Sequence, residues 1–262
     1  MPRWPYPRIV AHRGGGKAAP ENTLAAIRLG AELGFGGVEF DVMLSGDGVP
    51  VLIHDQKLER TTSGRGLVSA HSAAQLARLD AGAWKGRRWR GEPVPRLEQA
   101  AELCRALGLW ANVEIKPANG FERRTGEAVA RAARALWQGA PLAPVLSSFS
   151  PLALGAAREA APELPRGLLL KRRIPPHWLE MTRDLECVAL HCEGRLLTQA
   201  LVRAMHEAGV AVLAWTVNDP RAASKLLRWG VDCLVTDAVK RIGADFAAAA
   251  PRRGFWRRLR PK

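Results

Sequence analysis

The sequence predicts a (β/α)8 barrel, a closed ring of eight parallel strands in which each strand is followed by a helix. Strand-like apolar runs alternate with helix-like runs along the chain. The length of 262 residues suits one such domain. A further apolar run, 49–54, follows a predicted tight turn at Asp47-Gly48, so we expect it to be the returning arm of a hairpin and not a ninth barrel strand. We therefore expect a single domain over 1–250 and a basic, flexible tail at 251–262.

The first strand is predicted at 8–12 and leads into the glycine-rich loop 14–16. An amphipathic run follows Asn22, which is well placed as the N-cap of a helix. Gly34 stands where a glycine commonly ends a helix. The second strand is expected at 35–42.

The hairpin brings acidic residues and a histidine together. Counting outward from a two-residue turn pairs Leu44 with Val51 and Asp41 with His54. Glu39 lies two residues before Asp41, so both carboxylates share one face of their strand. Packed carboxylates repel one another unless a cation or protons lie between them, so a metal is the natural partner. A surface hairpin with solvated acids is the alternative.

The rest of the chain continues the alternation. Residues 56–95 lack it and are predicted to be an insertion after the second strand, with a short helix near 72–79. Further strands are predicted at 109–115, 143–149, 167–170, 187–191, 210–217 and 232–237. Helices are predicted at 96–108, 122–137, 151–161, 176–183, 198–208, 220–228 and 239–250.

The charge of the chain is concentrated in three places. The formal net charge is +14, and basic residues cluster at 85–91, 171–173 and 251–262, while the remainder is close to neutral. Such clusters favour phosphate-bearing substrates, anionic membrane surfaces or nucleic acid, although solubility alone also explains them. The four cysteines show no CxxC spacing and indicate reduced thiols. With no membrane-length apolar run and no signal-peptide core, a cytoplasmic location is expected.

Polar residues collect where the predicted strands end, which is where barrels of this kind carry their chemistry. His12 and Arg13 follow the first strand, and Glu114 and Lys116 end the third. Trp215 and Asn218 end the seventh, and Asp237 ends the eighth. Glu39, Asp41 and Glu114 offer hard oxygen ligands, which suit Mg²⁺ or Ca²⁺ better than Zn²⁺. Arg13 and Lys116 add positive charge for a phosphoryl group, and His12 and His54 can supply a base and an acid. Together these residue types predict cleavage of a phosphate ester.

The sequence resembles the glycerophosphodiester phosphodiesterase family over residues 8 to about 243. The motifs that carry the resemblance are AHRGGGKAAPENT (11–23), VEFDVMLSGDGVPVLIHD (38–55), KLERTT (57–62), LARLDAGAWKG (76–86), GEPVPRLEQA (91–100), VEIK (113–116), SSF (147–149), AWTVN (214–218) and GVDCLVTD (230–237). Departures from the usual pattern are Ser45, Lys85, Trp89 and Val239, and they bear on the choice of alcohol.

The resemblance implies a phospholipase-C-like barrel and hydrolysis of glycerophosphodiesters, such as glycerophosphocholine or glycerophosphoethanolamine, to glycerol 3-phosphate and an alcohol. It implies metal ligation by Glu39, Asp41 and Glu114, with His54 as a possible further ligand. It implies a catalytic pair of His12 and His54. The remaining matches are phosphate contacts by Arg13 and Lys116, and substrate contacts by Phe149 and Trp215.

The expected mechanism begins with His12 taking a proton from the nucleophile, either the glycerol C2 hydroxyl or a water, while His54 protonates the leaving alcohol. A lysophospholipase D or a phospholipase C acting on lipids is an alternative. A catalytically silent barrel that binds anionic surfaces or nucleic acid is another, but it would predict altered site residues, and here the set is intact. We expect weak contact of 251–262 with an anionic inner-membrane surface and no nucleic-acid partner. The sequence does not predict an oligomeric state.

Overall fold

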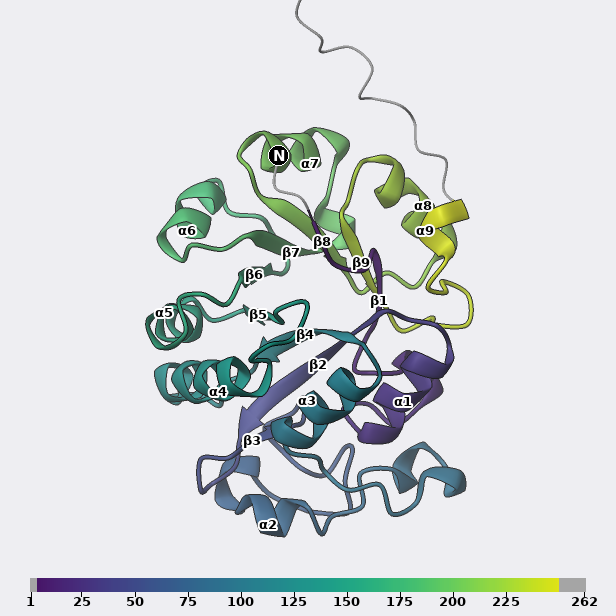
Figure 1. Cartoon of the computed structure of the whole chain (residues 1–262), viewed down its shortest axis with the longest axis vertical. Coiled ribbons are helices and arrows are strands. Elements are labelled where there is room, and N and C mark those ends of the chain that lie inside the picture. The colour runs from purple at the N-terminus through teal and green to yellow at the C-terminus, as the bar shows by residue number, and fades with distance from the viewer. Residues whose placement is uncertain (1–3, 250–262) are drawn as a thin grey trace, which may run out of the picture.

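The computed structural model describes residues 4–249, and they form the predicted closed barrel (Figure 1). The ring contains β1 (Ile9–Ala11), β2 (Gly37–Leu44), β4 (Trp110–Ile115), β5 (Val145–Ser148), β6 (Arg166–Leu170), β7 (Ala189–Glu193), β8 (Ala211–Trp215) and β9 (Cys233–Thr236). These strands pair in parallel in the order β1-β9-β8-β7-β6-β5-β4-β2, and pairing of β1 with β2 closes the ring. The carboxyl ends of all eight strands therefore meet at one mouth.

Helices surround this ring as Figure 1 shows. They are α1 (Leu24–Glu32), α3 (Leu97–Ala106), α4 (Glu122–Leu136), α5 (Pro151–Ala160), α6 (Trp178–Asp184), α7 (Gln199–Glu207), α8 (Pro220–Arg228) and α9 (Phe246–Ala249). Side-chain caps start several of them: Ser150, Thr198 and Asp219 each accept a hydrogen bond from a backbone N–H in the first turn. Proline at the first turn of α5 and α8 fixes the backbone for helix entry. No described helix is long and apolar enough to cross a membrane.

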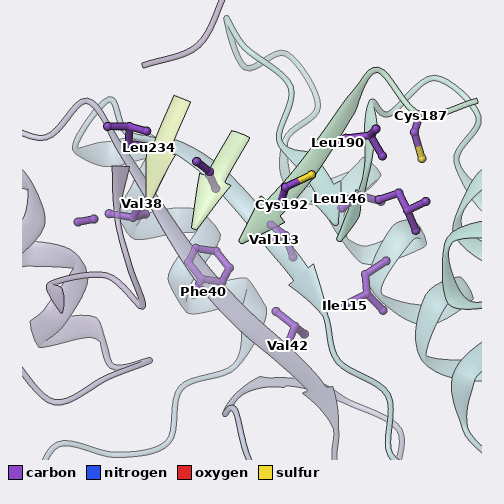
Figure 2. Close-up of a cluster of buried hydrophobic side chains, with 14 of the residues drawn as sticks. Val38, Phe40, Val42, Val113, Ile115, Leu146, Cys187, Leu190, Cys192 and Leu234 are labelled. Carbon is purple, nitrogen blue, oxygen red and sulfur yellow. The ribbon is translucent and has the colours of Figure 1, made fainter. Parts of the chain in front are cut away.

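The main core lies between the ring and the helices. Figure 2 shows side chains from neighbouring strands meeting there, including Val38, Phe40 and Val42 of β2 and Val113 of β4. Because side chains alternate along a strand, Glu39 and Asp41 of β2 are placed on the opposite face, inside the barrel. A second cluster fills the inside of the barrel. At the end opposite the mouth, Trp4 and Tyr6 pack on Trp110, the first residue of β4, with ring centroids 5.9 and 4.6 Å away.

The hairpin forms as predicted, but its register was predicted wrongly by one residue. β3 (Pro50–Leu52) pairs antiparallel with β2, and Leu44 faces Pro50 while Val42 faces Leu52. The connecting loop has three residues between Ser45 and Val49, closed by a hydrogen bond from the Gly48 N–H to the Ser45 carbonyl at 3.0 Å. Gly48 alone in this loop takes a positive φ, of 80°, so the two-residue turn with two positive φ values is absent.

The insertion after the hairpin has a small core of its own. It holds α2 (Ala73–Leu76), begun by a capping box at Ser72, and the 3-10 turns Val68–Ala70, Ala83–Lys85 and Arg87–Trp89. Its core residues are Met43, Val51, Ile53, Leu58, Val68, Ala73, Leu76, Ala81 and Val94. Since Ile53 belongs to this cluster, the insertion supports the chain segment that carries the neighbouring His54.

Two further predictions need correction. Thr23 and not Asn22 caps α1, because the Thr23 hydroxyl accepts from the Ala26 N–H and Asn22 has left-handed backbone with φ 58°. The last helix does not begin at 239. Residues 239–245 form turns around Gly243, and the described part of the helix is α9. The predicted tail at 251–262 lies outside the described residues.

Candidate active site

The barrel mouth contains a cavity of about 460 Å³, counting the space open to solvent, and it is lined by the nine residues to which the sequence analysis gave a catalytic, metal or substrate role. They are His12, Arg13, Glu39, Asp41, His54, Glu114, Lys116, Phe149 and Trp215. Each lies on, or just after, a strand or the hairpin. The folded chain therefore gathers into one cavity residues that are far apart in sequence.

Three carboxylates form the acidic centre of the cavity. Glu39 and Asp41 share the inner face of β2, and Glu114 on β4 is the register partner of Asp41. Ligand oxygens of the three lie within 4.8 Å of one another. All three residues are buried, with exposed fractions of 4, 1 and 9%. Glu39 Oε1 is buried and has no hydrogen-bond partner among the described residues, although buried polar atoms usually have one.

The carboxylates perturb one another's ionisation. Burial, together with the negative charge of Asp41, raises the pKa of Glu114 to about 8. Burial also raises the pKa of Glu39. Burial opposes ionisation of Asp41 too, but the charges of Lys116 and Arg13 outweigh it and hold the pKa of Asp41 well below its usual range. A cluster in which two of three carboxyls resist ionisation is short of positive charge.

Two cations compensate part of this charge. Lys116 Nζ lies 3.1 Å from both Asp41 Oδ1 and Glu114 Oε1. Arg13 Nε lies 3.4 Å from Asp41 Oδ2, and its Nη1 donates to Glu21 Oε1 at 2.5 Å. The Arg13 backbone N–H donates to Glu39 Oε2 at 3.0 Å. Arg13 itself has left-handed backbone with φ 50°, which turns the chain so that its N–H and side chain both face the cluster.

His12 is held at the cavity wall by a carboxylate behind it. Its Nδ1 lies 2.7 Å from Asp237 Oδ1, and its Nε2 lies 3.7 Å from Glu39 Oε2. Asn218 donates to Asp237 Oδ2 at 3.1 Å and accepts from the Asp237 N–H at 2.8 Å, which fixes the carboxylate. Burial opposes protonation of His12, but the bond to Asp237 and the charge of Glu39 outweigh it and raise the pKa of His12. Nδ1 is thus engaged, and Nε2 is the ring nitrogen available to the cavity.

His54 has a comparable arrangement built from loops. Its Nδ1 lies 2.5 Å from Asp55 Oδ1, and Arg60 Nε donates to the other Asp55 oxygen. Arg60 also makes two 2.8 Å hydrogen bonds to Glu21, which in turn binds Arg13. Burial lowers the pKa of His54, and the charges of Lys116 and Arg13 act in the same direction. The histidine of the hairpin is therefore tied to the loop that follows β1.

An apolar wall faces these polar groups. Phe149 and Trp215 pack edge to face with ring centroids 5.3 Å apart, and Lys171 Nζ lies 4.9 Å from the Phe149 centroid. Trp215 Nε1 donates to the His191 carbonyl at 3.0 Å. Leu169 and Leu213 also line the cavity. This wall can contact the carbon skeleton of a small substrate while its oxygens face the cations.

Several residues that organise the site were not predicted. Asn22 binds Asp41 twice, donating to Oδ2 at 2.9 Å and accepting from the Asp41 N–H at 3.0 Å. Glu21, Asp55 and Arg60 form the hydrogen-bond network that connects His54 to the loop after β1. Asp237 was placed at a strand end by the sequence, but its contact with His12 was not predicted. The adjacency of Asp55 to His54 was a usable signal, whereas the contact between Arg60 and Glu21 depends on the path of the insertion.

The comparisons with known proteins agree on one family. A family model described as "Glycerophosphoryl diester phosphodiesterase family" matches residues 12–241. The chain is 33% identical over 233 residues to a glycerophosphodiester phosphodiesterase from Caldanaerobacter subterraneus subsp. tengcongensis, covering 87% of this chain and 93% of that one. It is 30% identical to a putative glycerophosphodiester phosphodiesterase from Bacillus subtilis, with the same coverage of each chain.

Solved structures give the same result. A phosphodiesterase from Oleispira antarctica in complex with the product sn-glycerol-3-phosphate superposes with a TM-score of 0.85 and 39% identity, covering 91% of this chain and 96% of that one. A putative glycerophosphoryl diester phosphodiesterase from Silicibacter pomeroyi gives a TM-score of 0.82 and 26% identity, covering 94 and 95% of the two chains.

Proposed function

The chain belongs to the glycerophosphoryl diester phosphodiesterase family, and we propose that it hydrolyses glycerophosphodiesters to glycerol 3-phosphate and an alcohol with the help of a divalent cation. The similar Oleispira antarctica enzyme is described with sn-glycerol-3-phosphate as its product. The observation that carries the proposal is the buried cluster of Glu39, Asp41 and Glu114 between two histidines, each backed by a carboxylate.

The residues present fit a divalent cation. Glu39 Oε1 is buried without a partner among residues 4–249, and three carboxylates within 4.8 Å form an all-oxygen donor set. Hard oxygen donors suit Mg²⁺ or Ca²⁺, and we propose Glu39, Asp41 and Glu114 as the ligands. Bound there, the ion would withdraw charge from the phosphoryl oxygens. His54 as a further ligand stays a prediction.

Other residues of the cavity are suited to bind the substrate. We propose that Arg13 and Lys116 bind the non-bridging phosphate oxygens, since both are cations at the cavity wall. The glycerol carbons would pack against Phe149 and Trp215. The phosphate would then supply negative charge to Arg13 and Lys116, which in its absence face the carboxylates of the cavity.

The two histidines are placed to move protons. Each has Nδ1 fixed by a carboxylate, Asp237 for His12 and Asp55 for His54, which leaves Nε2 for the substrate. We propose that His12 removes the proton of the nucleophile, the glycerol C2 hydroxyl or a water, while His54 protonates the leaving alcohol. If the hydroxyl attacks, water then opens the cyclic phosphate and the histidines exchange roles, so that each is restored.

Turnover of glycerophosphocholine with and without chelator tests the proposal. We expect glycerol 3-phosphate and choline, loss of activity with chelator, and recovery when Mg²⁺ or Ca²⁺ is restored. Phosphocholine with free glycerol would refute the proposed bond, and unchanged turnover after chelation and dialysis would refute the metal. Lysophospholipids in parallel decide between this function and a lysophospholipase D. The cytoplasmic location and membrane contact through 251–262 stay predictions.

A further inference from the structure

A second concave surface lies beside the catalytic cavity, and we propose that it binds an additional phosphate group carried by the substrate. This basic groove is open to solvent and spans about 1060 Å³, counting the solvent space within it. Its lining residues are Lys17, Ala18, Lys85, Arg88, Trp89, Asn218, Asp237, Ala238, Val239, Lys240 and Arg241. The inference rests on the proposed function, because it concerns which glycerophosphodiesters the catalytic cavity receives.

Three separate chain segments bring cations to the basic groove. Lys17 comes from the loop after β1, Lys85 and Arg88 come from the insertion, and Lys240 and Arg241 follow β9. Convergence of segments so far apart in sequence is a property of the fold and not of one basic run. A groove lined by positively charged side chains concentrates their electric field and attracts anions.

These cations are not neutralised within the described structure. None of the five makes an ion pair within 4.0 Å with a described carboxylate, whereas other surface arginines, such as Arg123, Arg131 and Arg195, do. Asp237 is the acid that lines the basic groove, and its oxygens are already held by His12 and Asn218. The groove is therefore short of negative charge.

Two of the lysines have no other task in the part of the chain that is described. The side chains of Lys17 and Lys240 make no hydrogen bond, ion pair or ring contact there, and both are exposed. Arg88 and Arg241 instead donate to the Ala18 and Asn218 carbonyls, at 3.2 and 2.8 Å. The two arginines thus hold the walls of the basic groove in place, and the side chains of the two lysines are available to bind a ligand.

The basic groove and the catalytic cavity share a wall. Asp237 lines the groove and binds His12, which lines the cavity. The Lys17 N–H donates to the Asp237 carbonyl at 2.9 Å, and a Cβ on Gly16 would lie 2.4 Å from that oxygen. This close approach holds Lys17 beside the mouth, so one extended substrate can reach both the cavity and the groove.

The concave shape favours a phosphate group on a soluble substrate over a membrane surface. Trp89, the aromatic residue that lines the groove, is half-buried beneath Arg88, with the guanidinium carbon 4.6 Å from its ring centroid. A terminal phosphate monoester carries about −1.5 to −2 charge near pH 7 and offers three acceptor oxygens. We infer that glycerophosphodiesters bearing such a group are preferred over those with neutral or cationic alcohols.

A matched pair of substrates tests this inference: glycerophosphoglycerol, and the same compound with a terminal phosphate monoester. We expect KM to be about tenfold lower for the phosphorylated compound at low salt, with kcat little changed. The reason is that these exposed charges stabilise the bound substrate and the transition state equally. The advantage should shrink as salt approaches 0.5 M. Equal KM values for the pair would overturn the inference while leaving the proposed function intact.

The double substitution Lys17→Gln/Lys240→Gln assigns the effect to the basic groove. It removes two charges without breaking a described contact, and we expect the KM ratio of the two substrates to fall from about ten to near one. Lys57→Gln is the matched control, an exposed lysine that lines neither the cavity nor the groove, and it should keep the ratio. An unchanged ratio in the double variant would overturn the assignment.

Binding without turnover separates the inference from the proposed function. Calorimetry on His54→Ala protein should show the phosphorylated compound binding about tenfold more tightly than its parent, and the two groove substitutions should remove the difference. If neither compound is hydrolysed by the wild type, the proposed function fails even where this difference is found. Vesicles of phosphatidylglycerol form a further arm: if the groove substitutions abolish vesicle binding but leave the KM ratio unchanged, the groove serves lipid and the inference is wrong.

Discussion

Replacing Glu114 with glutamine should make the metal-free protein more stable at alkaline pH. Burial and the charge of Asp41 raise the pKa of Glu114 from its ordinary value of 4.5 to about 8. Between those two values the folded protein keeps a proton that the unfolded chain has lost. The free energy of unfolding must therefore fall as pH rises through this window.

The size of the effect follows from the same difference. The gap between 4.5 and about 8 corresponds to roughly 5 kcal/mol, at about 1.4 kcal/mol for each pKa unit. Rearrangement and water entry around a buried charge reduce such values, so roughly 2 kcal/mol is the expected minimum. Glutamine keeps the shape of the side chain and cannot ionise, and Lys116 retains Asp41 as a partner at 3.1 Å.

Denaturant unfolding in chelator, at pH 5.5 and at pH 9, measures the effect. Because pH 5.5 already lies one unit above the ordinary value, the wild type should lose about 2–3 kcal/mol more than Glu114→Gln on going to the higher pH. Added Mg²⁺ or Ca²⁺ should restore stability at pH 9 in the wild type and much less in the variant. Parallel pH profiles for the two proteins in chelator would show that Glu114 ionises as easily as in the unfolded chain, and the reasoning would be refuted.

Three further outcomes are expected. His12→Ala and His54→Ala should each reduce kcat by about 10² to 10⁴ without changing the circular dichroism spectrum, and full activity in either would remove that residue from the mechanism. Gly126→Ala should lower the unfolding free energy by about 1–3 kcal/mol, because a Cβ there would lie 2.1 Å from a carbonyl oxygen of α5. Gly155→Ala, whose added Cβ would meet no atom of the described residues within 4 Å, is the control and should be neutral or stabilising. Deleting 251–262 should leave turnover of soluble substrate nearly unchanged and abolish most binding to anionic vesicles at low salt; cosedimentation that is equal for both proteins would contradict it.

The barrel and the composition of its mouth were predictable for one reason. Parallel strands place their carboxyl ends together, so polar residues at predicted strand ends had to meet whatever the details of packing. Glu39, Asp41 and Glu114 illustrate this, because alternation along β2 and in-register pairing with β4 bring their oxygens together. Errors of a residue or two in strand boundaries do not change such a result.

Features decided by competing local signals were predicted less well. Asn22 resembles a helix cap in sequence, but its side chain satisfies Asp41, and the adjacent Thr23 takes over the cap. The Asp47-Gly48 pair indicated a two-residue turn, whereas Ser45 closes a longer loop with its backbone and side chain. The bonds from Arg60 to Glu21 depend on where an irregular insertion lies, which no periodic pattern encodes.

The two histidines are held in place by parts of the fold that differ in size. His12 continues a strand of the closed ring, and its N–H donates to the Thr236 carbonyl at 3.0 Å. His54 follows the strand outside the ring and depends on the small core that contains Ile53 and Leu58. Small peripheral cores open locally at a lower free energy than the whole domain. Such an opening would leave an intact barrel and acidic centre without the second histidine. The insertion would then determine how long the enzyme stays active at high temperature. Substitutions meant to extend that time belong in 56–95 and not in the barrel.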